Sequence, residues 1–309
     1  QVAQDARDFF DGKGVKGNQP ACGAYFAFVP ADSDHWCKCD RCQAVLAPGK
    51  ARNIKYTFGT GTASDYVFGF VNAVAREVAK THPNKYIATL AYHVYSYPPT
   101  FELEPNVAVA PCVQLCYAYQ KGTFDNDAKF YGEWVADKGR RIHLWNYFHH
   151  PMERAIIGGW KCFPCFMPDE ISKWVKRYHS DGVRGFYLCG LPQQVDYYLY
   201  MQTAFNVETD YKELVDEFFV RYFGEAAGVP MKQFHDLISQ ANREEGVLGT
   251  TEEASWERLG TQERMKELGA LIDRAAGQAH TDLHKQRVAI WKGAVWDYMA
   301  EGRREYIKK

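Results

Sequence analysis

The sequence predicts an α/β protein of the (β/α)8 (TIM) barrel type, or only the later strands of such a barrel, followed by an α-helical C-terminal region. Two observations lead to this fold class. Short apolar runs alternate with polar loops and amphipathic helices as far as residue 209, and from Asp210 onward the pattern is helical throughout. Strands that alternate with helices are typical of a parallel sheet with crossover helices.

Five apolar runs predict the buried strands of this sheet. They are Tyr25–Val29, Tyr86–Tyr92, Val107–Ala110, Arg141–Tyr147 and Val183–Cys189. Five strands are too few for a complete barrel, so we expect its later part, or a variant whose first strands lie upstream of Gln1. A doubly wound open sheet is the alternative, although no glycine-rich phosphate loop opens a helix.

Amphipathic stretches between these runs predict the crossover helices, and the residues without such a pattern predict loops. Ser64 or Asp65 caps a helix whose apolar positions, from Val67 to Val78, recur at helical spacing. The other predicted helices are 1–11, 127–138 and one that opens at Pro168, and the predicted loops include 43–61 and 190–200.

Helical stripes alone follow residue 210, with a break at 246–251. We therefore predict a barrel-like domain over residues 1–209 and an α-helical domain over residues 210–309.

The composition indicates a globular protein and excludes several classes of function. The chain has 309 residues, 46% hydrophobic and 24% charged, with a net charge of −1. No strong field directs it to nucleic acid or to an anionic membrane, and no run reaches the ~18 apolar residues of a membrane span. Because it begins at Gln1 without a signal-like segment, we expect a processed or truncated product.

Aromatic residues are unusually abundant, with 20 Tyr, 19 Phe and 8 Trp. One explanation is a large core rich in tyrosine. The other is a protein that handles carbohydrate, because sugar C–H faces stack on aromatic rings and hydroxyl groups pair with Tyr, Asp and His.

Polar and aromatic side chains follow the predicted strands, where a parallel α/β protein places its site. Asp32 and Asp34 come after the first strand and suit general acid/base work or the binding of sugar hydroxyls; their alternative role is turn formation. The candidate catalytic residues are Asp32, Asp34 and His93, and the candidate substrate-binding residues are Trp36, Tyr92, Trp145, Tyr147 and Asp196.

Nine cysteines occur, and three of them, Cys37, Cys39 and Cys42, lie within six residues. A disulfide within this loop or to a neighbouring loop is the favoured interpretation. A zinc site is the alternative, with a fourth ligand from Cys22, His35 or a distant cysteine, and buried free thiols are the third. We predict neither a bound metal nor a cofactor. Cys162 and Cys165 resemble a redox pair in spacing alone.

The order of several motifs resembles one family over roughly residues 20 to 228. The motifs are VPADSDHWCKCDRCQ, DYVFGFVNAVAREVAK, YIATLAYHVYSYPP, EPNVAV, IHLWNY, GVRGFYLCG and TDYKELVDEFFVRYFGEAA. They resemble the domain of unknown function 4838 (DUF4838), whose characterised members form glycoside hydrolase family 163. The resemblance implies a barrel followed by helices, and endo-β-N-acetylglucosaminidase-type action on N-glycans in an extracellular or periplasmic setting.

The resemblance also implies two acidic residues that this chain lacks. Val94 stands where a glutamate is expected, and Leu188 and Cys189 stand where another acid is expected. Glycoside hydrolysis ordinarily uses two carboxyl groups. The first hypothesis is therefore a glycosidase that uses other acids, with an oligosaccharide or glycoprotein glycan as its partner. The second is a non-catalytic carbohydrate-binding protein on a decayed barrel, and the third is a structural scaffold. The oligomeric state is not predicted.

Overall fold

The computed structural model describes residues 1–13, 23–33, 35–50, 58–120, 122–148, 151, 153–190 and 194–309. The chain divides into two compact units. Unit 1 comprises residues 1–113, 125–146 and 181–188, and unit 2 comprises residues 114–124, 147–180 and 189–309. The predicted boundary between residues 209 and 210 stays a prediction.

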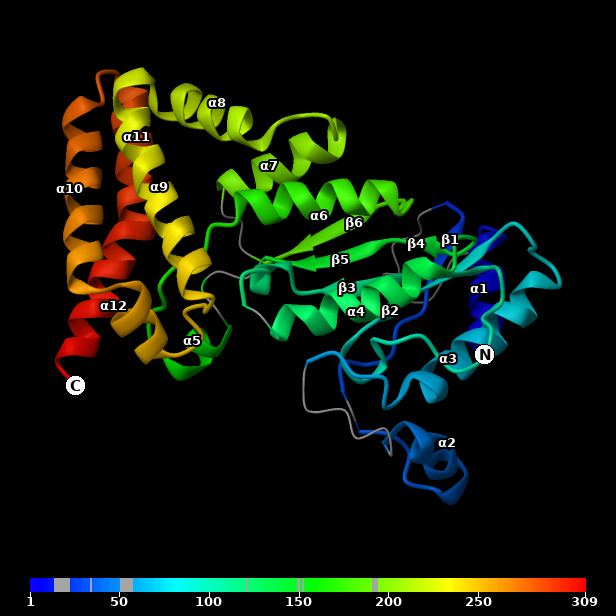
Figure 1. The fold of residues 1–309 in the computed structure, drawn as a ribbon. Helices are drawn as coiled ribbons and strands as arrows, with labels where there is room; N and C mark the ends of the chain where they lie inside the picture. Colours follow the sequence, from blue (N-terminus) through cyan, green and yellow to red (C-terminus); the bar gives the residue numbers. More distant parts are fainter. Residues whose placement is uncertain are drawn as a thin grey trace. The chain divides into compact units, whose positions relative to one another are not determined.

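A curled parallel sheet is the framework of unit 1 (Figure 1). Its strands are β1 (Tyr25–Ala27), β2 (Tyr86–Ala91), β3 (Val107–Val113), β4 (Arg141–Ile142), β5 (Leu144–Tyr147) and β6 (Phe186–Cys189). The strand order is β1-β2-β3-β5-β6, and the pairs β1–β2, β2–β3, β3–β4 and β3–β5 are parallel. The mixed α/β fold with a parallel sheet is thereby confirmed.

The strands lie in the order in which they occur along the chain. β4 and β5 both pair with β3 and are separated by His143, whose N–H donates to the Val109 carbonyl at 2.9 Å. They therefore act as the single predicted strand 141–147. A doubly wound sheet reverses its strand order at a switch point, so this sequential order argues against that alternative.

Helix α3 (Ser64–Ala79) covers part of the sheet in unit 1, as its pattern predicts. Its buried face includes Val67, Val71 and Val78, and it packs on β2 and β3. Helix α1 (Val2–Phe10) packs on α3 and β1. Helix α4 (Thr123–Ala136) begins four residues earlier than predicted.

Residues 43–50, predicted as part of a loop, belong to helix α2 (Asp40–Lys50), so that prediction is wrong. The loop was predicted from Pro48 and Gly49, which lie in the last turn of the helix. Leu46 is 1% exposed, and α2 packs on α3. A Cβ at Gly49 would lie 2.2 Å from the Thr62 carbonyl oxygen, so the close approach of the two backbones requires glycine there.

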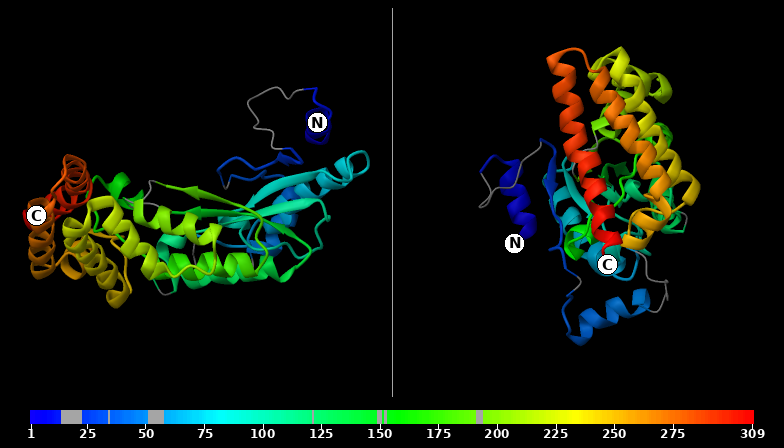
Figure 2. Two further views of the ribbon diagram at one scale, coloured as in Figure 1. Left: turned by 90° about the horizontal axis from the view of Figure 1, so that it is seen from above. Right: turned by 90° about the vertical axis from the view of Figure 1, so that its left-hand side faces the viewer.

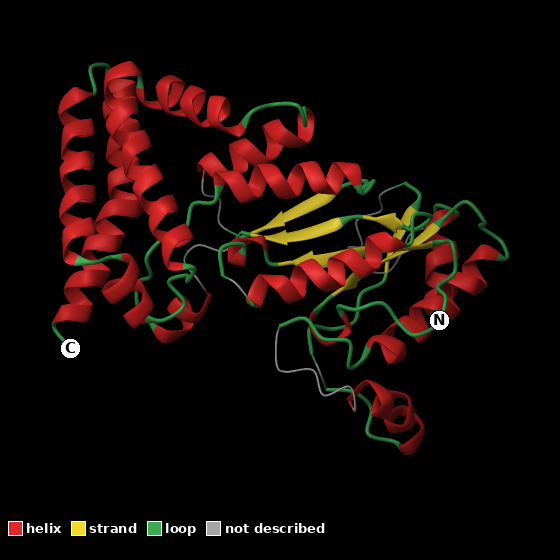
Figure 3. Cartoon of the chain, in the orientation of Figure 1, coloured by secondary structure: helices red, strands yellow, loops and turns green. Residues whose placement is uncertain are grey.

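Unit 2 is almost entirely helical beyond β6 (Figure 3). Its helices are α5 (Glu153–Gly158), α6 (Pro168–Ser180), α7 (Gln194–Phe205), α8 (Tyr211–Phe223), α9 (Glu225–Glu245), α10 (Gln262–Gln278), α11 (Asp282–Trp291) and α12 (Tyr298–Ile307). A π-helical segment, Lys292–Asp297, joins α11 to α12, so that one long helix lies beside α10 and α9 (Figure 2). The helical C-terminal region is confirmed. None of the described helices is both long and apolar enough to cross a membrane.

The predicted loop 190–200 is also wrong in part, because α7 begins at Gln194. Val195, Leu199 and Tyr200 are buried in this helix. The four-residue recurrence of the buried positions Val195, Leu199 and Thr203 is helical, but apolar residues on the other positions of the segment mask the stripe in the sequence.

Candidate functional site

A groove in unit 1 lies beside the end of β1 and runs along α2 and α3. Its volume is about 760 Å³. Aromatic and apolar side chains dominate its wall, and the residues that the argument uses are Phe28, Trp36, Cys39, Cys42, Tyr66 and Phe70. Concave, mostly apolar sites with a few polar groups are typical of small-molecule binding.

A row of aromatic rings continues from this groove to the carboxyl end of β2. The Trp36 ring centroid lies 5.4 Å from that of Tyr66 and 6.5 Å from that of Tyr95. Tyr95 lies 6.2 Å from Tyr92, and Tyr92 lies 5.3 Å from Phe58. All four of these pairs meet edge to face, an arrangement that aromatic quadrupoles favour. We call Trp36, Tyr66, Tyr95, Tyr92 and Phe58 the aromatic row.

Asp32 is an exposed residue in the segment that links β1 to Trp36. Burial raises the pKa of Tyr95 well above its usual range, and the charges of Cys112, Tyr92 and Asp32 add to this effect. Asp34, the other predicted acid of this loop, lies outside the described residues.

His93 follows β2 in a strained backbone conformation. Its φ is 48°, and among the described non-glycine residues it alone has a positive φ. The His93 carbonyl accepts hydrogen bonds from Thr60 N–H at 2.8 Å and from Ser96 Oγ at 2.9 Å. These bonds fix the turn, and the centroid of the His93 ring lies 5.4 Å from that of Phe58. Strain of this kind costs of order 1–3 kcal/mol and gathers at functional sites.

The predicted aromatic pair of β5 shows the expected alternation. Burial along β5 alternates between buried and half-buried, with Trp145 and Tyr147 half-buried and Asn146 buried between them. Trp145 packs at a tilt against Tyr187 of β6, with ring centroids 4.2 Å apart at an interplanar angle of 35°.

Asp196 lies in unit 2, on α7, and is 1% exposed. Neither carboxyl oxygen has a hydrogen-bond partner within normal geometry. Burial raises its pKa to about 8; the Met167 backbone amide opposes this shift, and the charge of Asp169 adds to it. A glycan would reach this carboxyl only if the surrounding side chains moved, so its substrate-binding role stays a prediction.

The three clustered cysteines lie at the start of α2 as thiols. The sulfurs of Cys37, Cys39 and Cys42 all lie within 4.8 Å of one another, and Cys37 Sγ is 3.5 Å from Cys39 Sγ. A disulfide has an S–S length of about 2.05 Å. No disulfide joins any of the described cysteines, so the predicted disulfide is not supported. Cys22 lies outside the described residues.

From the sequence, Asp32, Trp36, Tyr92 and His93 were predicted to lie at one edge of the sheet. In the structure, Trp36 and Tyr92 contact Tyr95, and His93 contacts Phe58. Tyr66 and Tyr95 were not predicted as site residues. The signal for Tyr66 was present, because Tyr66 and Phe70 stand four residues apart on a second apolar face of α3. Phe70 is 57% exposed, as befits a groove wall.

Comparison with known proteins bears out the predicted family. The model of the domain of unknown function (DUF4838) matches residues 20–236, well over half of the chain. No curated protein matches the chain. The chain therefore belongs to the DUF4838 family.

Proposed function

We propose that this chain binds carbohydrate through the groove and the aromatic row of unit 1. The observation that carries the proposal is the row itself, which runs from Tyr66 in the groove to Phe58 beyond β2. Sugar rings would stack their C–H faces on the half-exposed rings of the row, Trp36, Tyr66, Tyr92 and Phe58, which buried Tyr95 supports from below. Asp32 and His93 would supply polar groups for the hydroxyls. The ligand we favour is an oligosaccharide of the N-glycan type, met in an extracellular or periplasmic setting.

We also propose that the sheet is part of a (β/α)8 barrel. The sequential order of parallel strands supports this, since each strand of such a barrel lies next to the one before it. Barrel enzymes carry their sites at the carboxyl ends of the strands. The aromatic row occupies that position, because Trp36 follows β1 and Tyr92 follows β2.

Hydrolysis of an N-acetylhexosamine linkage is the second candidate function. The observation that favours it is the strained His93 turn, whose ring contacts Phe58 of the aromatic row. Most glycosidases use two carboxyl groups, but in substrate-assisted families the acetamido group of the sugar replaces the nucleophile. One acid then suffices as proton donor, which would suit a chain with Val94 and Leu188 in the expected acid positions.

Binding is tested by calorimetric titration of the protein with N-glycans that have been released from glycoproteins. Trp36→Ala should weaken binding about tenfold or more, which corresponds to about 1.4 kcal/mol. Phe205→Ala is the control, because Phe205 is an aromatic of unit 2 that is 91% exposed. Equal affinity of wild type and Trp36→Ala, or no binding by the wild type, would overturn the proposal.

Hydrolysis is tested by measuring reducing ends released from an N-glycoprotein. The wild type should release them, and Asp32→Asn should reduce the rate about 100-fold or more, as loss of a general acid does. Binding without release would leave the first candidate standing and exclude the second. Equal release by both proteins would exclude Asp32 as the acid.

A further inference from the structure

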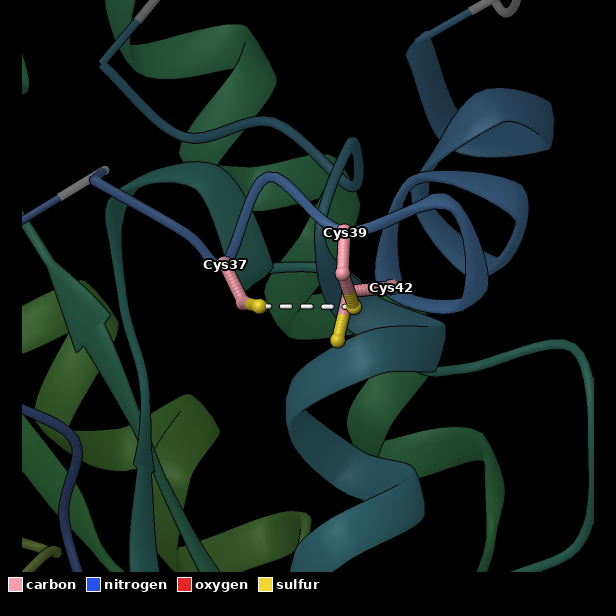
Figure 4. A group of neighbouring side chains, drawn as sticks. All are labelled: Cys37, Cys39 and Cys42. Atoms are coloured by element: carbon pink, nitrogen blue, oxygen red, sulfur yellow. Dashed lines mark hydrogen bonds between the residues drawn. The ribbon is translucent and has the colours of Figure 1, made fainter.

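We propose that Cys37, Cys39 and Cys42 bind one zinc ion. Figure 4 shows the three side chains converging on a common point, although Cys37 and Cys39 precede α2 and Cys42 lies within it. Thiolates are ligands of choice for Zn²⁺, and the two residues between Cys39 and Cys42 match a spacing that recurs in zinc sites.

The distances between the sulfurs fit a shared ion. With Zn–S bonds of about 2.3 Å, the sulfurs of a tetrahedral site lie about 3.8 Å apart. Cys37 Sγ and Cys39 Sγ are 3.5 Å apart, and every pair in the cluster is within 4.8 Å. The cluster therefore needs shifts of at most about an ångström per sulfur to reach the geometry of a site.

The surroundings of the sulfurs supply the support that metal ligands receive in proteins. Cys39 directly precedes α2 and Cys42 stands in its first turn, where the helix dipole favours negative charge. Tyr66 Oη donates a hydrogen bond to Cys42 Sγ at 3.6 Å. Gln43 Nε2 donates to the Cys37 carbonyl at 2.6 Å, which ties the loop to the helix. Such outer-shell bonds orient ligands and tune the affinity for the ion.

Three thiolates leave one position of a tetrahedral zinc ion for water or another exchangeable ligand. Cys37 and Cys39 are exposed, so solvent reaches the site. Cys39 and Cys42 also line the groove. The ion would therefore lie in the groove wall, where it would fasten the loop that carries Trp36 to α2.

The test uses the full chain, purified without chelator. Elemental analysis should find one zinc ion per chain. After removal of the ion, added Co²⁺ should give a sulfur-to-cobalt charge-transfer band, and Zn²⁺ should displace it. Cys37→Ser, Cys39→Ser and Cys42→Ser should each abolish stoichiometric binding. Cys189→Ser is the control, because this half-exposed cysteine of β6 lies outside the cluster.

Tyr66→Phe separates the site from general damage to the fold, since it removes one hydrogen bond and keeps the three sulfurs. It should retain the ion and weaken the affinity about tenfold or more, as loss of an outer-shell bond does. The proposal fails if the wild type shows neither stoichiometric zinc nor the charge-transfer band. It also fails if Cys39→Ser keeps a full equivalent of zinc, or if Cys189→Ser loses it.

Discussion

Two cysteine pairs with the same spacing lie in opposite environments. Cys39 and Cys42 of unit 1 lie at the start of α2, where Cys39 is exposed. The Cys42 backbone amide, followed by the Cys37 side chain, holds the pKa of Cys39 below its usual range. Cys162 and Cys165 of unit 2 are 0% and 7% exposed. Burial raises the pKa of Cys165 well above its usual range, and the charge of Asp196 adds to this effect.

The difference shows that a C-x-x-C pattern does not define a chemistry by itself. At the start of a helix and in contact with water, the Cys39 thiol is reactive and able to bind a metal. In an apolar core the same residues act as small hydrophobic side chains. The predictions below test this contrast, from the largest expected effect to the smallest.

Thiol alkylation should separate the two pairs most strongly. With the protein folded and a chelator present, Cys39 should react with iodoacetamide roughly a thousandfold faster than Cys162 and Cys165. Buried thiols react through local opening, which costs several kcal/mol. Peptide mapping by mass spectrometry gives the rate at each site, and similar rates for the two pairs would contradict the contrast.

The buried acid beside Cys165 should make stability depend on pH. Asp196 ionises near pH 4 when unfolded and at about 8 when folded. Between these values the folded state holds a proton that the unfolded state has lost, so stability falls as the pH rises. Between pH 4 and pH 7 the free energy of unfolding should fall by roughly 4 kcal/mol.

Asp196→Asn should remove this dependence, because an amide has no proton to lose. Denaturant unfolding from pH 4 to pH 7 measures it, with Asp273→Asn, an exposed acid of α10, as the control. Parallel pH curves for wild type and Asp196→Asn would show that Asp196 is ionised in the fold.

Truncation of one cysteine from each pair should give the smallest difference. Cys165→Ala removes a buried sulfur and should cost about 1–2 kcal/mol of unfolding free energy. Cys42→Ala, measured without metal, should change the free energy of unfolding by less than about 0.5 kcal/mol, which is usual for a half-exposed position. The same unfolding assay decides, and a larger cost for Cys42→Ala would mean that α2 depends on this thiol even without an ion.

Much of the sheet was predictable because its strands are short, apolar and buried. The runs at Tyr86, Val107 and Arg141 each gave a strand close to the predicted bounds. The elements that were missed contain conflicting local signals. α2 ends over Pro48 and Gly49, and the glycine is required by a backbone contact with Thr62 that the sequence does not show.

The site was predictable where it depends on strand ends and unpredictable where it depends on contacts between elements. Trp36 and His93 follow neighbouring parallel strands, whose carboxyl ends share an edge. Tyr66 joins them through the packing of α3 on the sheet, and the sulfur distances follow from the start of α2. Asp196 was placed at the rim because its segment was predicted as a loop, and the helix buries it instead.

The division into units has a consequence for how this protein can be altered by recombination. From the stated ranges, the chain passes between the units five times, after residues 113, 124, 146, 180 and 188. Neither unit corresponds to one continuous stretch of its gene. A crossover between relatives at almost any position between residues 114 and 188 would mix parts of both units. Cores that have adapted to their own side chains would then be exchanged in pieces. Both cores stay intact only when the two units come together from the same parent.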